Sequence, residues 1–223
     1  MRRPRAIVIN NDDPESDYGA CHLAAAMAPR FETAVVSPVG GFADGRAWVE
    51  RHGADALILS GSDRSVGEDL PWMREEEELL RFAVVRGLPV LAICFGHQLL
   101  ARAFGAAIVS ARKRVGLFEI EPTIDDPVFE GADRRLVVPE QHADQVAEVP
   151  PGFVLLATSE YCRVQAMRHR ERLVYGFQFH PCYEADVFDV DEEWGALAFS
   201  GAFVHDGSLI LANVARLFVE GLR

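Results

Sequence analysis

The chain has 223 residues, of which 49% are hydrophobic and 25% charged, and this composition excludes a disordered or collagen-like protein. Its 22 lysines and arginines against 34 aspartates and glutamates give a net charge of −12. Because nucleic acids and anionic membrane surfaces are bound through cationic side chains, this charge disfavours both as partners and favours a small-molecule role.

The first half of the chain alternates apolar runs with helix-like segments. Strands are expected at Ala6 to Asn10, Phe31 to Val36, Ala56 to Leu59 and Pro89 to Ile93. These runs lack polar alternation, which is typical of parallel strands covered on both faces. Helices are expected at Tyr18 to Ala28 and Pro71 to Arg86, and the acidic run Glu75 to Glu78 is expected to form a solvated helix face.

Further strand signals follow in the second half. They lie around Gly116 to Ile120, Leu136 to Val138, Phe153 to Ala157, Arg163 to Met167 and Val174 to Phe179. A last helix is expected at about Leu209 to Val219. This order predicts an α/β three-layer sandwich with a mostly parallel central sheet and an antiparallel portion. No linker or repeat divides the chain, so we expect residues 1–223 to form a single domain.

The sharpest local signal is a strand that runs directly into a helix at Cys94. Ala92 and Gly96 flank this cysteine two positions away on either side, which is the small-x-nucleophile-x-small pattern of a nucleophile elbow. The tight turn needs small neighbours, and the amino terminus of the following helix favours a thiolate. Cys94 is therefore a candidate nucleophile; the alternative is a buried structural cysteine at a strand end.

A cysteine nucleophile needs a proton-transfer partner, and the chain offers seven histidines. His180 follows the apolar run Val174 to Phe179, so it lies where a buried strand emerges from the sheet. His142 is expected to begin a loop after a strand, and His97 lies inside the helix after the elbow. A Cys/His hydrolase needs a histidine that is distant in sequence and brought close by the fold. His180 and His142 meet this requirement, and His97 could be either a site residue or a surface residue.

These stretches resemble the signatures of the class I (triad) glutamine amidotransferases. Ala92 to Gln98 resembles the nucleophile motif of that family, and Gly176 to Pro181 resembles its histidine motif. Leu57 to Ser62 is similar to the oxyanion loop, and His142 to Asp144 to the His-x-Asp loop. All four occur in family order. The Ser-Gly-Ser loop together with Cys-Phe-Gly-His-Gln is most similar to stand-alone GMP-synthase-like amidotransferases and γ-glutamyl peptidases.

The resemblance implies a flavodoxin-like fold and a thioester mechanism. Cys94 would attack the side-chain amide of glutamine, or another γ-glutamyl linkage. His180 would carry the proton, first to the leaving amine and then from water. The N–H of Phe95 and an N–H in the turn at Gly61 and Ser62 would hold the developing oxyanion.

The resemblance also implies how substrate and partners are held. Gln98 would bind the amino-acid end of the substrate, and the same pocket would be lined by His142, Ala143 and Asp144. No cofactor and no metal is implied. A synthase partner could receive the ammonia, and the chain could form an oligomer.

The chain departs from the family pattern after His180. The family continues His-Pro-Glu, in which the glutamate orients the histidine, whereas Cys182 stands at that position here. A thiol orients an imidazolium poorly, so either Glu184 or Asp186 substitutes, or Cys94 and His180 act as a dyad. The acidic, aromatic segment from Glu184 to Asp206 could be a lid, a specificity loop, an oligomer contact or a plain surface excursion.

We therefore expect an amidotransferase-like enzyme that hydrolyses a γ-glutamyl amide, converting glutamine to glutamate and ammonia. One alternative is a γ-glutamyl peptidase that acts on a glutathione-like conjugate. Another is a catalytically impaired family member that serves as a binding or regulatory subunit, which Cys182 favours. The apolar stretch Ala6 to Ile9 is too short for a signal-peptide core and no run approaches a membrane span of ~20 residues, so we expect a cytoplasmic location.

Overall fold

The computed structural model describes residues 2–12, 18–38, 45–183 and 204–223. The strands are β1 (Arg5–Ile9), β2 (Glu32–Val36), β3 (Ala56–Leu59), β4 (Val90–Ile93), β5 (Ile108–Pro122), β6 (Leu136–Val146), β7 (Phe153–Thr158), β8 (Ala166–His169) and β9 (Val174–Phe177). The helices are α1 (Tyr18–Met27), α2 (Gly45–His52), α3 (Pro71–Arg86), α4 (Phe95–Ala103) and α6 (Gly207–Gly221), with short 3-10 turns η1 (Val66–Glu68) and η2 (Pro127–Phe129). Most of the predicted elements therefore occur where the sequence placed them.

The strands form one nine-stranded sheet in the order β2-β1-β3-β4-β9-β8-β7-β5-β6. The four pairings from β2 through β9 are parallel. The four pairings from β9 through β6 are antiparallel. The sheet is thus mixed, with a larger antiparallel part than the predicted portion. Short connections between consecutive strands allow antiparallel pairing, whereas parallel pairing needs a crossover such as a helix.

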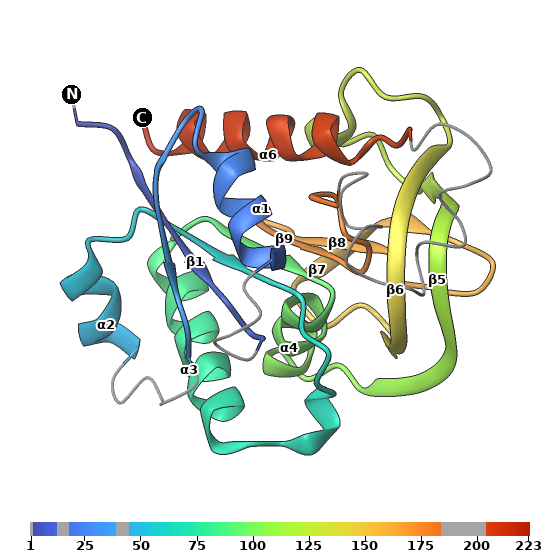
Figure 1. Cartoon of the computed structure of the whole chain (residues 1–223), viewed down its shortest axis with the longest axis horizontal. Coiled ribbons are helices and arrows are strands. Elements are labelled where there is room, and N and C mark those ends of the chain that lie inside the picture. The colour runs from blue at the N-terminus through green and yellow to red at the C-terminus, as the bar shows by residue number, and fades with distance from the viewer. Residues whose placement is uncertain (1, 13–17, 39–44, 184–203) are drawn as a thin grey trace.

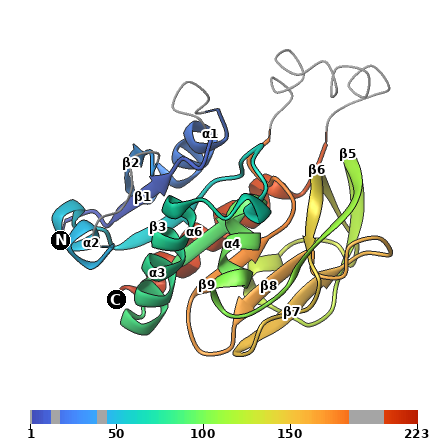
Figure 2. The same ribbon diagram turned by 90° about the horizontal axis from the view of Figure 1, so that it is seen from below.

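Helices cover both faces of the parallel part (Figure 1). Alternate side chains of β1 enter two different cores: Ala6 and Val8 pack with α1 and α6, while Ile7 and Ile9 pack with α3 and α4. A strand buried on both faces needs apolar residues at every position, which explains the continuous apolar runs. The predicted α/β three-layer sandwich is confirmed, and Figure 2 shows the long β5 and β6 pair beyond the helices at the far side of the sheet.

Strand β6 is longer than the sequence suggested. It continues past Val138 to Val146, because β5 runs alongside it and pairs Arg114 with His142 and Ser110 with Asp144. The prediction that His142 begins a loop is therefore wrong. The side chains of this stretch are instead held in a strand, where successive residues point to opposite faces.

The acidic run on α3 is also placed differently from the prediction. Glu76 is fully buried, because it follows Met73 at the helical spacing and lies on the same face as Leu79 and Leu80. Glu77 forms an ion pair with Arg102 of α4. The run therefore contributes to the packing of α3 and is not simply a solvated face.

Candidate functional site

Cys94 occupies the turn between β4 and α4. Its backbone adopts φ 48° and ψ −103°, one of two positive φ angles among the described non-glycine residues. The Cys94 N–H donates to the carbonyl of Phe177 at 2.8 Å, so the turn is held against the end of β9. A Cβ added at Gly96 would lie 2.7 Å from the Leu59 Cβ, which explains the small residue two positions after the cysteine. This strained strand-to-helix turn has the form of a nucleophile elbow.

The thiol of Cys94 is buried and lies near two polar groups. It is 4% exposed, and its Sγ lies 3.7 Å from the Gln141 carbonyl and 3.7 Å from the Gln178 amide nitrogen. Burial raises the pKa of the Cys94 thiol to about 12, although the Phe95 N–H acts in the opposite direction. We expected the helix amino terminus to favour the thiolate, but desolvation outweighs that effect here.

His180 lies beside the elbow. Its ring stacks on Tyr183 with 4.2 Å between centroids and an interplanar angle of 18°, and its backbone N–H donates to the Pro139 carbonyl at 2.8 Å. Burial and the neighbouring His142 lower the pKa of His180 to about 3, while the Gln141 carbonyl opposes this shift. The ring nitrogen Nε2 is buried and makes no hydrogen bond within the described part of the chain. A neutral imidazole with a vacant nitrogen can accept a proton.

The loop after β3 brings Gly61 against the side chains of Cys94 and His180. A Cβ added at Gly61 would lie 2.9 Å from His180 Cε1 and 3.5 Å from Cys94 Cβ. Only a glycine permits this approach without a shift of the imidazole. Ser62 follows, and its hydroxyl accepts a hydrogen bond from the Arg64 N–H at 3.1 Å.

A cavity of about 430 Å³ lies beside Cys94. The sequence-predicted residues among its lining are Ser62, Cys94, Gln98, His142, Ala143 and Asp144. Its volume lies within the range of small-molecule pockets. Of the remaining predicted residues, Gly61, Phe95 and His180 adjoin the elbow and are not part of this lining.

The predicted binding residues are fixed by hydrogen bonds. The Gln98 amide donates to the Asp144 carbonyl at 2.8 Å, and the Asp144 carboxylate accepts from the Ser65 hydroxyl at 2.5 Å and the Ser110 hydroxyl at 2.8 Å. His142 Nε2 lies 3.0 Å from the Glu140 carboxyl group. These contacts hold one wall of the cavity in place.

Cys182, at the position of the family glutamate, lies away from the cavity at Cys94. Its thiol points to the Gly19 carbonyl of α1 at 4.0 Å, and the side chain belongs to the apolar core between α1 and α6. Glu184 and Asp186, the two proposed substitutes, lie outside the described residues.

Several lining residues were not predicted from the sequence. They are Asp63, Arg64, Ser65, Ser110, Lys113 and Gln141. Ser110 and Lys113 come from β5, which carries no recognisable motif, and only its pairing with β6 brings it to the site. Gln141 precedes the His-x-Asp stretch, and its contribution is a backbone carbonyl, which no side-chain motif could indicate.

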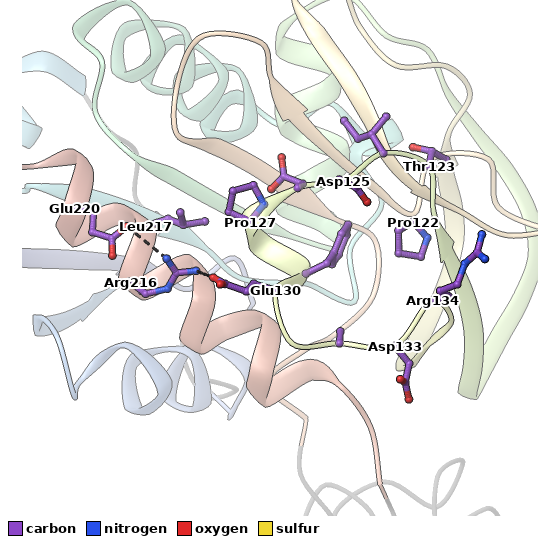
Figure 3. A pocket seen from close by; sticks show the side chains of 14 residues that line it. Pro122, Thr123, Asp125, Pro127, Glu130, Asp133, Arg134, Arg216, Leu217 and Glu220 are labelled. Carbon is purple, nitrogen blue, oxygen red and sulfur yellow. Dashed lines mark hydrogen bonds and ion pairs between the residues drawn. The ribbon is translucent and has the colours of Figure 1, made fainter.

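A second hollow of about 990 Å³ lies between α6 and the segment that joins β5 to β6. Figure 3 shows Arg216 of α6 paired with Glu130 and Glu220 at its edge. Its lining contains neither cysteine nor histidine. The described residues hold no group of three metal-ligating side chains, and none of their helices is long and apolar enough to cross a membrane.

The chain is similar to known proteins of one family. A family model described as glutamine amidotransferase class-I matches residues 32–190. The chain is 47% identical over 127 residues to a subunit of the glutamine-hydrolysing GMP synthase of Pyrococcus abyssi, covering 56% of this chain and 68% of that protein. It is 35% identical over 187 residues to the corresponding subunit of Methanosarcina acetivorans, covering 81% and 88%.

A solved structure supports the fold. The glutamine amido transferase of Methylobacillus flagellatus superimposes with a TM-score of 0.78 over 100% of this chain and 96% of that chain, at 23% identity. At that identity the likeness concerns the fold alone. The extent of the family match and the Methanosarcina relative confirm the predicted resemblance, so this chain belongs to the class I glutamine amidotransferase family.

Proposed function

We propose that this chain hydrolyses glutamine to glutamate and ammonia through a thioester on Cys94. The observation that carries the proposal is the meeting of Cys94, His180 and Gly61 at the elbow, beside a cavity of about 430 Å³. A nucleophile, a base with a vacant nitrogen and a close backbone loop are the groups that acyl transfer needs.

The reaction follows from these positions. The Cys94 thiol attacks the side-chain amide carbon of glutamine, and its proton passes to His180. The oxyanion that forms is held by the Phe95 N–H and an N–H of the turn at Gly61 and Ser62. His180 then gives the proton to the leaving ammonia, and a water molecule, deprotonated by the same imidazole, releases glutamate from the thioester.

The charge state of the pair before substrate binds supports transfer of a proton during attack. With a thiol pKa near 12 and an imidazole pKa near 3, both groups are uncharged at neutral pH. The proton must therefore move as the sulfur–carbon bond forms. A bound substrate that supplies a polar carbonyl beside the thiol offsets part of the desolvation that causes these shifts.

The wall formed by Gln98 and His142 to Asp144 would receive the amino-acid end of glutamine. This assignment is supported by the place of these residues in the cavity lining. Arg64 and Lys113 lie in the same lining and could face the substrate carboxylate. The relatives are named as subunits of GMP synthase, which supports delivery of the ammonia to a synthase partner.

We further propose that residues 1–223 act as one amidotransferase domain, supported by the single sheet that joins the parallel and antiparallel parts. The cytoplasmic location and the possibility of an oligomer stay predictions. The chain matches only part of some relatives: the subunit of Thermococcus kodakarensis is covered to 50% of its length. Its activity, substrate and partner are therefore proposals for this chain.

The test is ammonia release from glutamine, compared with amine release from a γ-glutamyl dipeptide. We expect glutamine to be the better substrate, because the relatives are named as glutamine-hydrolysing. Cys94→Ala should abolish release, and intact mass of the parent protein should show a γ-glutamyl adduct on Cys94. The control is Cys21→Ala, which removes an exposed cysteine of α1 and should leave activity unchanged.

Two outcomes would redirect the assignment. Preference for the dipeptide would favour the γ-glutamyl peptidase alternative. Absence of turnover on both substrates, with no adduct, would favour an impaired family member that acts as a binding or regulatory subunit.

A further inference from the structure

The position at which the family carries the carboxylate that orients the histidine holds Cys182 in this chain, and the Cys182 thiol is directed to α1. Two of the contacts that hold His180 come from β6. The Pro139 carbonyl accepts its backbone N–H at 2.8 Å, and the Gln141 carbonyl interacts with its ring. The Gln141 carbonyl also lies 3.7 Å from the Cys94 Sγ. One backbone oxygen thus contacts both partners of the proposed proton transfer.

The residue between these two carbonyls is Glu140, which is fully buried. One of its carboxyl oxygens accepts the Tyr161 hydroxyl at 3.0 Å and the Gln165 amide at 2.8 Å. The other lies 3.0 Å from His142 Nε2. A buried carboxyl group must be satisfied in this way, and these contacts hold the Glu140 side chain in one position.

Arg114 packs against the network through Tyr161. The Arg114 guanidinium lies over the Tyr161 ring at 3.3 Å and over the Phe118 ring at 4.6 Å. Arg114 pairs with His142 across the β5 and β6 ladder, so the cation and the carboxyl group of Glu140 tie neighbouring strands together. The contacts of Glu140 with His142, Tyr161 and Gln165 consequently anchor this stretch of β6.

We propose that Glu140 is a positioning residue that fixes the Pro139 and Gln141 carbonyls against His180 and Cys94, and so replaces the orienting carboxylate missing at Cys182. The inference rests on the proposed function, because it concerns the same nucleophile and base. Glu140 touches neither substrate nor reacting atoms. It acts through the strand in which it lies.

The direction in which the Cys94 alkylation rate changes in Glu140→Gln distinguishes a positioning role from a purely electrostatic or a purely structural one. The negative charge of Glu140 contributes to raising the pKa of Cys94. If Glu140 acted only through its field, Glu140→Gln would therefore make Cys94 easier to ionise and faster to alkylate. If it served only overall stability, alkylation of Cys94 in the folded protein would not change. If it positions the carbonyls and His180, Cys94 should be alkylated more slowly.

The experiment compares Glu140→Gln with Asp126→Asn, which changes another buried acid, one that pairs with Arg168 at 2.6 Å and does not line the cavity at Cys94. For Glu140→Gln we expect kcat for glutamine to fall about tenfold and Cys94 alkylation by iodoacetamide at pH 7 to slow about tenfold. For Asp126→Asn we expect a lower Tm with kcat and alkylation unchanged. Peptide mapping identifies the alkylated cysteine.

A milder variant keeps the test decisive if Glu140→Gln does not fold. Tyr161→Phe removes one hydrogen bond to Glu140 and should lower kcat and the alkylation rate in the same direction, by about threefold. Faster or unchanged alkylation in the folded variants would overturn the inference. If the parent protein releases no ammonia from glutamine, the proposed function fails, and the alkylation rates alone decide the role of Glu140.

Discussion

No room remains for a methyl group between Gly61 and His180. A Cβ at position 61 would lie 2.9 Å from the Cε1 atom of His180, closer than a Cβ approaches a non-bonded atom in folded proteins. The same Cβ would lie 3.5 Å from Cys94 Cβ, at ordinary contact distance. The loop after β3 and the loop after β9 therefore meet at the elbow, where the His180 imidazole packs directly against the Gly61 backbone.

Gly61→Ala should reduce kcat strongly and leave the fold intact. The added methyl group displaces the His180 ring, and a displacement of about 1 Å at a reacting group can cost roughly a hundredfold in rate. Steady-state ammonia release with a thermal unfolding curve measures both effects. Gly19→Ala is the matched control, because nothing lies within 4 Å of a Cβ added there. Equal activity of the two variants would contradict the close packing.

Cys94→Gly should be more stable than Cys94→Ala. Both variants lose the proposed nucleophile, but the φ angle of 48° strains any residue with a Cβ. Relief of such strain corresponds to about 1 kcal/mol or more. Urea unfolding of the two inactive variants gives the difference. The control is Ala101→Gly, in the buried interior of α4. Glycine should destabilise the protein there, by about 1 kcal/mol. An equally stable Cys94→Ala would mean that the elbow is relaxed.

Glu76→Gln should change how stability depends on pH. Burial raises the pKa of Glu76 from 4.5 to about 8, so the folded protein holds a proton that the unfolded chain releases. Protonated Glu76 makes its full contribution to the free energy of unfolding of the parent protein below about pH 4.5, and this contribution is lost as pH rises towards 8. The Gln variant cannot ionise, so it should exceed the parent in stability at pH 8.5 and approach it at low pH.

Unfolding curves of parent and variant at pH 5 and pH 8.5 test this expectation. Glu78→Gln changes an exposed glutamate of the same helix and should leave the pH dependence of the parent protein unaltered. A gap between Glu76→Gln and the parent that stays the same at both pH values would show that Glu76 titrates normally.

Cys182→Glu should lower stability without raising turnover. Cys182 is 4% exposed and borders a small hollow of about 270 Å³ between α1 and α6, where a carboxylate would lose its water. Such burial costs several kcal/mol unless the charge finds a partner. His180 is already held by Tyr183 and the β6 carbonyls, so a further acid adds little. Thermal unfolding and ammonia release are compared with Cys182→Ala. Faster release by Cys182→Glu would mean that His180 is poorly oriented in the parent protein.

The amino-acid pattern predicts the local architecture. The apolar runs predicted strands at β1, β3 and β4 within a residue or so, because a strand buried on both faces must be apolar throughout. The helical stripe predicted α3 from Pro71 to Arg86, with Pro71 at its first position and Gly87 closing it at φ 71°. The spacing of small residues around Cys94 predicted the elbow, because that turn tolerates nothing larger.

Contacts between segments distant in sequence account for the features that the pattern does not predict. The length of β6 depends on its pairing with β5, and the burial of Glu140 depends on Tyr161 and Gln165, which lie far along the chain. Cys182 occupies the position of a catalytic acid in the motif, but packing against α1 directs its thiol elsewhere. Periodicity and spacing describe neighbours along one element. Two contacts of His180 are with backbone carbonyls of β6, and only the fold brings them to it.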